Sequence, residues 1–240
     1  MIIKADMHIH TCLSPCAEVT ISPKRVVEQA YRSGLSIIFI TDHNSAENTE
    51  AAMKAASTYD SIRVYPGMEI TSREEVHTLA LFEEIGNASD MQNEFYKFLP
   101  DALSEKEFNK QVIANEFDEV EGYCKKSLFS AADLSIEEIV NMIHKYRGLA
   151  IAAHIDRESF SILGQLGFIP ENLKYDALEV SPNTTIEQAK IRYKEYSDTY
   201  NFVKGSDSHW LEAIGGIYTE FEAKENSFSS FASYIKRKIN

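Results

Sequence analysis

The chain has 240 residues, 44% hydrophobic and 25% charged, which is typical of a globular protein rather than a disordered one. Its 24 Lys and Arg against 37 Asp and Glu give a formal net charge of −13, so we expect long nucleic acid to be a poor partner, although bound divalent cations would still admit small anions. No apolar run approaches the ~20 residues that span a bilayer, and the start of the sequence lacks the layout of a signal peptide. Three cysteines are too few for a disulfide framework. We therefore predict a cytoplasmic protein with no membrane partner.

The first predicted strand, around residues 5–10, places Asp6, His8 and His10 on one face. Successive side chains of a strand alternate between faces, so Ala5, Met7 and Ile9 would lie opposite. Two imidazoles spaced in this way can converge on one cation. Taken alone, the pair is equally compatible with chance.

Predicted helices and strands alternate after this strand. Ser22 and Pro23 form the N-cap and first position of a helix that ends near Gly34. The strand over 36–41 is apolar on both faces, as in the interior of a parallel sheet. The remaining elements of this half are a helix over 46–57, a strand over 62–70 that breaks near Pro66 and Gly67, and a strand over 76–82.

The second half begins with an acidic stretch over 86–130 that we interpret as a mostly helical elaboration with little strand character. Ser135 and Glu138 form the capping box of a helix that runs through Tyr146. The chain is completed by strands over 149–153, 177–180, 201–204 and 216–218 and by a helix over 229–239. Repeated strand and helix units indicate an α/β fold with a parallel sheet, and about seven of them favour a barrel, so we predict one domain over 1–240.

Histidines and carboxylates gather at the ends of the predicted strands. In a barrel the strand ends on one rim share a cavity, even when they are far apart in sequence. Each histidine alone is more simply explained by ordinary hydrogen bonding, but the set together favours a metal site. The eight candidate ligands are His8, His10, His43, Glu69, His77, His154, Asp207 and His209, which leaves only His144, inside a helix, apart from the other histidines.

The order of these motifs resembles the polymerase-and-histidinol-phosphatase (PHP) family of metal-dependent phosphoesterases. The matching motifs are His8-Ile9-His10, Thr41-Asp42-His43, Gly67-Met68-Glu69, His77, His154 and Asp207-Ser208-His209. The resemblance implies a distorted (β/α)7 TIM-like barrel that carries a trinuclear metal centre at its carboxyl rim. It also implies two or three divalent metals per chain, and this mixed ligand set suits Zn, Mn or Fe.

The resemblance further implies how the ligands are divided. One metal would take His8, His10, Glu69 and Asp207, and a second would take Glu69, His77 and His154. The third would take His43, His209 and a residue of the loop after the first strand, where this chain has Cys16 instead of the usual Asp or His. Either the Cys16 thiolate completes the site and favours Zn or Fe over Mg, or Cys16 is a buried loop thiol.

The expected reaction is hydrolysis of a small phosphomonoester, either nucleotide-like or a sugar or amino-alcohol phosphate. Clustered divalent ions lower the pKa of bound water to about 7, so we expect a hydroxide held between metals to attack phosphorus in line. Asp207 and His209 are expected to serve this reaction as well as the metals.

Other side chains are expected to support the reaction. Arg73 and Arg157 would clamp the phosphate, with surface ion pairing as the alternative. Asp6 and Asp42 would orient imidazoles by accepting their second N–H group. Glu179 would either do the same or be a carboxylate of the barrel core that pairs with a neighbour.

Two other function classes stay open. Amidohydrolases also begin a barrel with His-x-His but cleave C–N bonds and usually have a bridging lysine, where this chain offers Glu69. A non-catalytic metal-binding domain of the same fold is the third class, and such domains normally lose ligands. The oligomeric state is not predicted.

Overall fold

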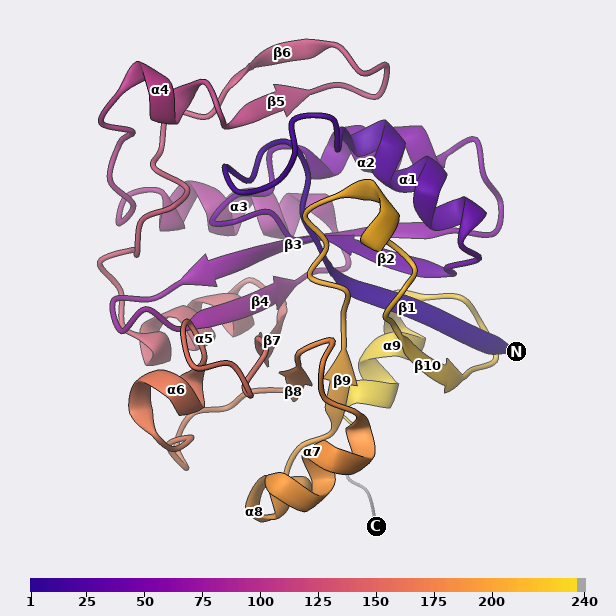
Figure 1. The fold of residues 1–240 in the computed structure, drawn as a ribbon, viewed down its shortest axis with the longest axis vertical. Helices are drawn as coiled ribbons and strands as arrows, with labels where there is room; N and C mark the ends of the chain where they lie inside the picture. The colour runs from indigo at the N-terminus through magenta and orange to yellow at the C-terminus, as the bar shows by residue number, and fades with distance from the viewer. Residues whose placement is uncertain (237–240) are drawn as a thin grey trace.

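The computed structural model describes residues 1–236, and its centre is an eight-stranded sheet in the order β10-β1-β2-β3-β4-β7-β8-β9 (Figure 1). β3 and β7 both run antiparallel to β4, so the six strands other than β4 and β10 point the same way. The eight strands of the sheet are β1 (Ile2–Ile9), β2 (Ile37–Ile40), β3 (Arg63–Thr71), β4 (His77–Leu81), β7 (Leu149–Ala152), β8 (Ala177–Val180), β9 (Phe202–Lys204) and β10 (Thr219–Glu222).

The edges of this sheet meet, which makes it a nearly closed barrel. Beyond the end of β9, Ser208 forms a parallel bridge with Ile9, and the His10 N–H donates to the Ser208 carbonyl over 3.1 Å. The two edge strands are also joined directly, because the Lys204 N–H at the end of β9 donates to the Thr219 hydroxyl at the start of β10 over 2.8 Å. The predicted α/β TIM-like barrel is confirmed. Because β4 is reversed, its first residue lies at the same rim as the carboxyl ends of β1, β2 and β3.

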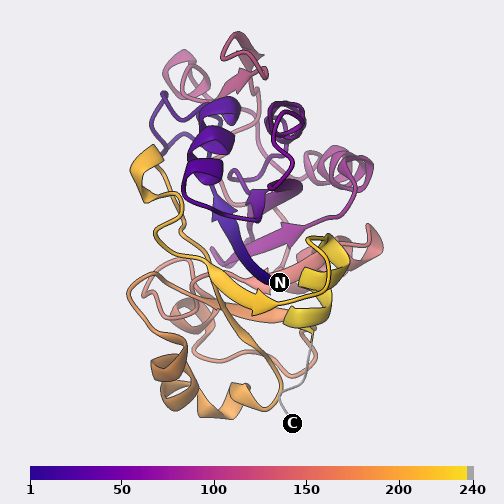
Figure 2. The same ribbon diagram turned by 90° about the vertical axis from the view of Figure 1, so that its right-hand side faces the viewer.

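Apolar side chains fill the barrel below this rim. Met7, Phe39, Leu79 and Val203 belong to one buried cluster, and α9 adds Phe231 to it. Figures 1 and 2 show α9 beside β10, near the start of β1. The amino end of the barrel is therefore closed by a helix, and the carboxyl rim is left for polar groups.

Helices cover the outside of the sheet. α1 and α2 pack against β1 to β3, and α3 and α5 pack against the β3, β4 and β7 side. The helices are α1 (Pro23–Arg32), α2 (Thr49–Ala56), α3 (Ile85–Phe95), α4 (Glu105–Phe108), α5 (Ile136–Lys145), α6 (Ile162–Leu166), α7 (Ile186–Arg192), α8 (Lys194–Ser197) and α9 (Phe228–Ile235), with a short 3₁₀ helix η1 (Leu211–Ala213). The caps predicted for α1 at Ser22 and for α5 at Ser135 are confirmed.

β3 continues through Pro66 and Gly67, so the predicted break is wrong. Pro66 pairs with Ile40, and its carbonyl accepts the Phe82 N–H over 2.8 Å, so its missing N–H does not interrupt the strand. A Cβ at Gly67 would lie 2.7 Å from the Thr41 side chain and 3.1 Å from the Ala80 carbonyl, so glycine allows β2, β3 and β4 to approach closely.

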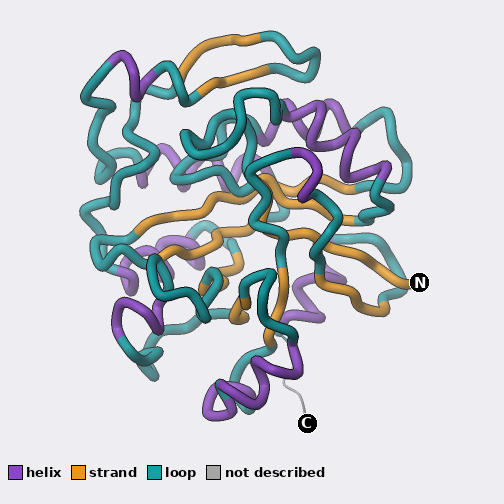
Figure 3. The backbone as a smooth tube through the Cα atoms, viewed as in Figure 1, coloured by secondary structure: helices purple, strands orange, loops and turns teal. Residues whose placement is uncertain are grey.

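The 86–130 segment is only partly helical. Besides α3 and α4 it contains an antiparallel hairpin of β5 (Val112–Ala114) and β6 (Val120–Tyr123), which lies apart from the main sheet (Figure 3). Asn48 donates to the Val112 carbonyl over 3.1 Å and accepts the Ala114 N–H over 3.0 Å, while the Val112 N–H donates to the Cys12 carbonyl. The hairpin is therefore bound to the loops that follow β1 and β2.

The end of the chain differs slightly from its prediction. The strand expected at 216–218 is β10 and begins three residues later, at Thr219. The last predicted helix corresponds to α9, and residues 237–239 of that prediction lie outside the described residues. Within residues 1–236, no helix is both long and apolar enough to cross a bilayer.

Candidate metal centre

Glu69 lies at the centre of a buried cluster at the carboxyl rim. Five imidazoles from β1, β2, β4 and β7 or the residues after them surround its carboxylate, which is 1% exposed. The nearest nitrogen-to-oxygen distances are 3.2 Å for His8, 3.4 Å for His10, 3.0 Å for His43, 2.7 Å for His77 and 3.1 Å for His154. The structure thus brings together candidate ligands that the sequence separates by up to 146 residues, from His8 to His154.

Asp207, after β9, completes one side of the cluster. Its Oδ1 lies 3.3 Å from His8 Nε2 and 3.2 Å from His10 Nε2. Its Oδ2 lies 2.5 Å from Nη2 of Arg157, whose side chain is 43% exposed. The ring of His209 stacks on that of His10 with 4.2 Å between centroids.

Three sets of donor atoms are close enough to hold metal ions. In each set the atoms lie within 4.8 Å of one another. The sets are His8, His10, Glu69 and Asp207; His43, Glu69 and His77; and His10, His43 and His209. The first set is the one that the family resemblance implied, whereas the second contains His43 in place of His154.

His8 and His10 are oriented with one nitrogen free toward the cluster. The Glu179 carboxylate accepts from His8 Nδ1 over 3.0 Å, and the Ser14 hydroxyl accepts from His10 Nδ1 over 2.9 Å while it donates to Asp42. Nε2 of both imidazoles is buried and has no hydrogen-bond partner among the described residues. A metal ion provides the partner that these nitrogens lack, so the donor set fits divalent cations.

Opposite charges keep the two carboxylates of the cluster ionised. Burial alone would raise the pKa of Glu69, but the surrounding imidazoles hold that pKa well below its ordinary value. Burial also opposes ionisation of Asp207, yet the charge of His8 holds its pKa well below the ordinary value. Burial and the neighbouring His209 lower the pKa of His10, so this imidazole is neutral. Ionised carboxylates and neutral imidazoles are the forms that bind metal. Burial would lower the pKa of His8, but Glu179 and Asp207 raise that pKa well above its ordinary value, so a cation would displace a proton from His8.

Cys16 faces two of the candidate ligands, His43 and His209. Burial would raise the pKa of its thiol, but hydrogen bonds with His209 and His43 lower the pKa to about 7. Although its thiol is partly screened from solvent, Cys16 as a whole residue is exposed whereas Cys12 is buried, so the description of a buried loop thiol fits Cys12 better than Cys16. A thiolate beside His43 and His209 is chemically suited to a metal.

A bulge in β1 changes the expected role of Asp6. The pairing of β1 with β2 shifts register between Asp6 and Ile9, so Met7 packs inside the barrel while Ile9 packs with α1 and α2. Strict alternation is therefore wrong here. Asp6 accepts the backbone N–H groups of His8 and Ser206 and contacts no imidazole in the described structure.

Other supporting residues also differ from expectation. Asp42 acts on His10 through Ser14, a residue that no sequence pattern singled out. Glu179 orients His8 directly, as predicted from sequence. The Arg73 guanidinium is bound by Asp133 over 2.9 Å and is 55% exposed, so its recorded partner is outside the cluster.

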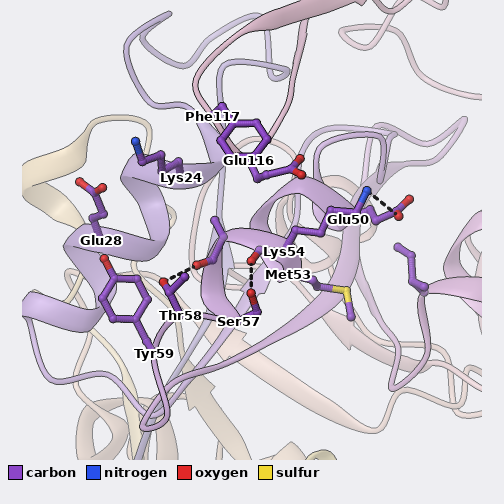
Figure 4. A pocket seen from close by; sticks show the side chains of 12 residues that line it. Lys24, Glu28, Glu50, Met53, Lys54, Ser57, Thr58, Tyr59, Glu116 and Phe117 are labelled. Atoms are coloured by element: carbon purple, nitrogen blue, oxygen red, sulfur yellow. Dashed lines mark hydrogen bonds and ion pairs between the residues drawn. The ribbon is translucent and has the colours of Figure 1, made fainter.

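A cavity of about 740 Å³ lies away from this centre. It is bounded by α1, α2 and the loop between β5 and β6, and Lys24, Tyr59 and Phe117 are among the side chains that line it (Figure 4). None of the eight candidate ligands lines it. The position of the site is therefore given by the convergent donor atoms and not by this cavity.

Convergent imidazoles and carboxylates at the carboxyl rim of an α/β barrel define the class of protein, a metal-dependent hydrolase. Residues 6–203 match the family model described as PHP domain, and residues 189–238 match a model described as PHP-associated. The chain belongs to the PHP domain family. A comparison with curated protein sequences gives no significant match.

Solved structures share the fold at low sequence identity. The lesion-specific endonuclease PfuEndoQ from Pyrococcus furiosus has a TM-score of 0.76 and 17% identity over 98% of this chain and 56% of that chain. An endonuclease Q complex with a 27-mer duplex that carries an abasic lesion at the active site has a TM-score of 0.74 and 17% identity. The match covers 98% of this chain and 57% of that chain. A protein assigned as a metal-dependent phosphoesterase from Bifidobacterium adolescentis has a TM-score of 0.53 and 20% identity over 85% and 87%. The chain thus spans little more than half the length of the endonuclease Q chains.

The expectation of a small phosphorylated substrate with no long nucleic acid is wrong. A protein of this fold, endonuclease Q, is seen with a 27-mer duplex at its active site. The net charge of −13 sums the whole surface and counts no bound cations, whereas several divalent ions at one rim reverse the potential locally. Net charge is therefore no criterion against nucleic acid for this fold.

Proposed function

We propose that the chain hydrolyses phosphodiester bonds of nucleic acid with divalent metals at the rim of its barrel. The observation that carries the proposal is the convergence of five imidazoles on Glu69, with Nε2 of His8 and His10 buried and without a hydrogen-bond partner within residues 1–236. The likeness of fold to endonuclease Q, whose complex contains duplex DNA, supports nucleic acid as the substrate class.

The proposed ligands combine the donor sets of the structure with the division that the family resemblance implies. His8, His10, Glu69 and Asp207 would hold one cation, and Glu69 with His77, His154 and His43 would hold a second. His43, His209 and Cys16 would hold a third, which a thiolate biases toward Zn or Fe. When bound, divalent metals supply a nucleophile at neutral pH and neutralise charge on the phosphate.

Arg157 is the proposed phosphate-binding cation of the chain. Its contact with Oδ2 of Asp207 fixes the guanidinium beside the first donor set and leaves Oδ1 directed at His8 and His10. Because the side chain is 43% exposed, the remaining N–H groups can reach a phosphate oxygen from solvent. Arg73 is bound by Asp133, so we assign the clamp to Arg157 alone.

The other two function classes have less support. A carboxylate, Glu69, occupies the centre of the cluster where an amidohydrolase usually has a bridging lysine. A degenerate domain would lack ligands, whereas all eight expected side chains are present at this rim.

A cleavage assay tests the proposal. Purified protein is analysed for metal by mass spectrometry and then incubated with end-labelled single-stranded DNA, with duplex DNA with and without an abasic site, and with p-nitrophenyl phosphate. We expect internal cleavage of DNA that is lost with chelator and in Glu69→Ala. The variant His144→Ala, which removes the histidine paired with Asp176 instead, should retain cleavage.

Three results would overturn the proposal. Cleavage of p-nitrophenyl phosphate without cleavage of any DNA would show a phosphomonoesterase. Hydrolysis of C–N bonds in an amide panel would indicate an amidohydrolase, and tightly bound metal without any hydrolysis would indicate a non-catalytic domain.

A further inference from the structure

Phe160 is a half-exposed aromatic residue beside the metal centre. Its ring stacks on that of His77 with 4.7 Å between centroids and 27° between planes. The residue is 43% exposed, so a substantial part of the ring faces solvent next to a metal ligand. An aromatic surface in this position is available to a second ring.

The backbone holds Phe160 in a costly conformation. Its φ is +57°, in the left-handed region that bulky residues rarely adopt. The Phe160 carbonyl accepts the His77 N–H over 2.9 Å, and the next residue, Ser161, donates to the Arg157 carbonyl over 2.6 Å as it caps α6. Such strain persists only where surrounding contacts fix it, so the position of the ring is well defined.

The same short loop carries the proposed phosphate clamp. It begins at His154, presents Arg157 toward Asp207, and ends with Phe160 on His77. A guanidinium and an aromatic ring therefore flank the donor sets from one segment. A cation for the phosphate and a ring for the base are the two contacts that sequence-tolerant binding of single-stranded nucleic acid requires.

We infer that Phe160 stacks on the nucleobase next to the hydrolysed phosphate. The inference rests on the proposed function and adds a residue that determines which substrates bind well. Stacking would favour a nucleotide that carries a base over the same backbone without one. Trp210 is the competing candidate, because it follows His209 and is 51% exposed.

Binding with a fluorescent base tests the inference apart from turnover. 2-Aminopurine is placed on either side of the cleaved phosphate of a single-stranded oligonucleotide, and its fluorescence is followed on addition of the metal-loaded protein. We expect quenching with wild-type protein, little quenching with Phe160→Ala, and recovery with Phe160→Trp. Phe168→Ala, which removes an exposed phenylalanine after α6, is the matched control and should behave as wild type.

Kinetics provide the second readout. Phe160→Ala should lower kcat/KM by about 5- to 150-fold, the usual worth of one stacked base, on the oligonucleotide with a base at that position. It should have little effect on the oligonucleotide that has an abasic residue there, and metal content should be unchanged.

The outcomes are separable. Equal quenching with wild type and Phe160→Ala, or loss of quenching in Trp210→Ala alone, overturns the inference. An equal loss of activity on both oligonucleotides together with lost metal also overturns it, because Phe160 would then only support His77. Quenching that depends on Phe160 in a protein that cleaves no DNA upholds the inference and refutes the proposed hydrolysis.

Discussion

Replacement of Glu179 should weaken metal binding although this residue is not itself one of the proposed ligands. Glu179 is 1% exposed in β8 and accepts from His8 Nδ1 over 3.0 Å and from the His154 N–H over 3.1 Å. Both bonds can be accepted by the same oxygen, Oε2. Glu179→Gln can therefore keep the two hydrogen bonds and lose only the negative charge, whereas Glu179→Ala loses the hydrogen bonds as well as the charge.

The two variants should differ in magnitude. Loss of a partner that orients a metal-bound imidazole typically costs 10- to 100-fold in metal affinity. We expect Glu179→Gln near the lower limit, about 1.4 kcal/mol, because His8 keeps its orientation. Glu179→Ala should lie near the upper limit, about 2.7 kcal/mol, because the imidazole is then free to turn.

Competitive titration with a fluorescent chelator measures this affinity, and mass spectrometry counts the metal that stays bound. Asp176→Asn is a matched control, since Asp176 also accepts from a histidine, His144 Nε2 over 3.0 Å, and from a backbone N–H, that of Ala150. That pair lies at the opposite end of β7 from His154 and should leave metal affinity unchanged. Unaltered affinity in both Glu179 variants, or an equal loss in Asp176→Asn, would refute the reasoning.

Three further predictions concern single residues. Cys16→Ser should lower the metal bound per chain or shift its identity from Zn or Fe toward Mn, and mass spectrometry that finds both unchanged would exclude Cys16 as a ligand. Arg157→Ala should lower kcat/KM for DNA about 10- to 100-fold with metal content retained; unaltered kinetics would remove the clamp. Burial raises the pKa of Asp6 from 3.8 to about 7. In chelator-treated protein, the free energy of unfolding of wild type relative to that of Asp6→Asn should therefore fall as the pH rises from about 4 to about 7. Urea titrations that give a constant difference between the two proteins would contradict this.

The convergence of the candidate ligands could be predicted because their chemistry is local. An imidazole or carboxylate at the end of an apolar strand is visible in the sequence, and a barrel brings such ends together. His77 was found for the same reason, although the sequence did not show that β4 runs in the opposite direction. The roles of the ligands in individual metal sites stay predictions.

Features that depend on tertiary contacts could not be predicted. The bulge in β1 redirects Asp6, and no residue type marks it. Ser14 joins Asp42 to His10 through space, and the strands β5 and β6 span only three and four residues, too short for a periodic pattern. Phe160 lies in a loop, where exposed aromatic residues carry no signal of position.

The junction between β1 and the segment after β9 has a consequence for the order of folding. Backbone pairing there is limited to the isolated bridge of Ile9 with Ser208. Under the proposed ligand set, His8 and His10 on one side of this junction bind the same cation as Asp207 on the other. The first cation site would therefore stay incomplete during synthesis until a residue almost 200 positions after His8 is made, and cation uptake would follow the approach of these two segments.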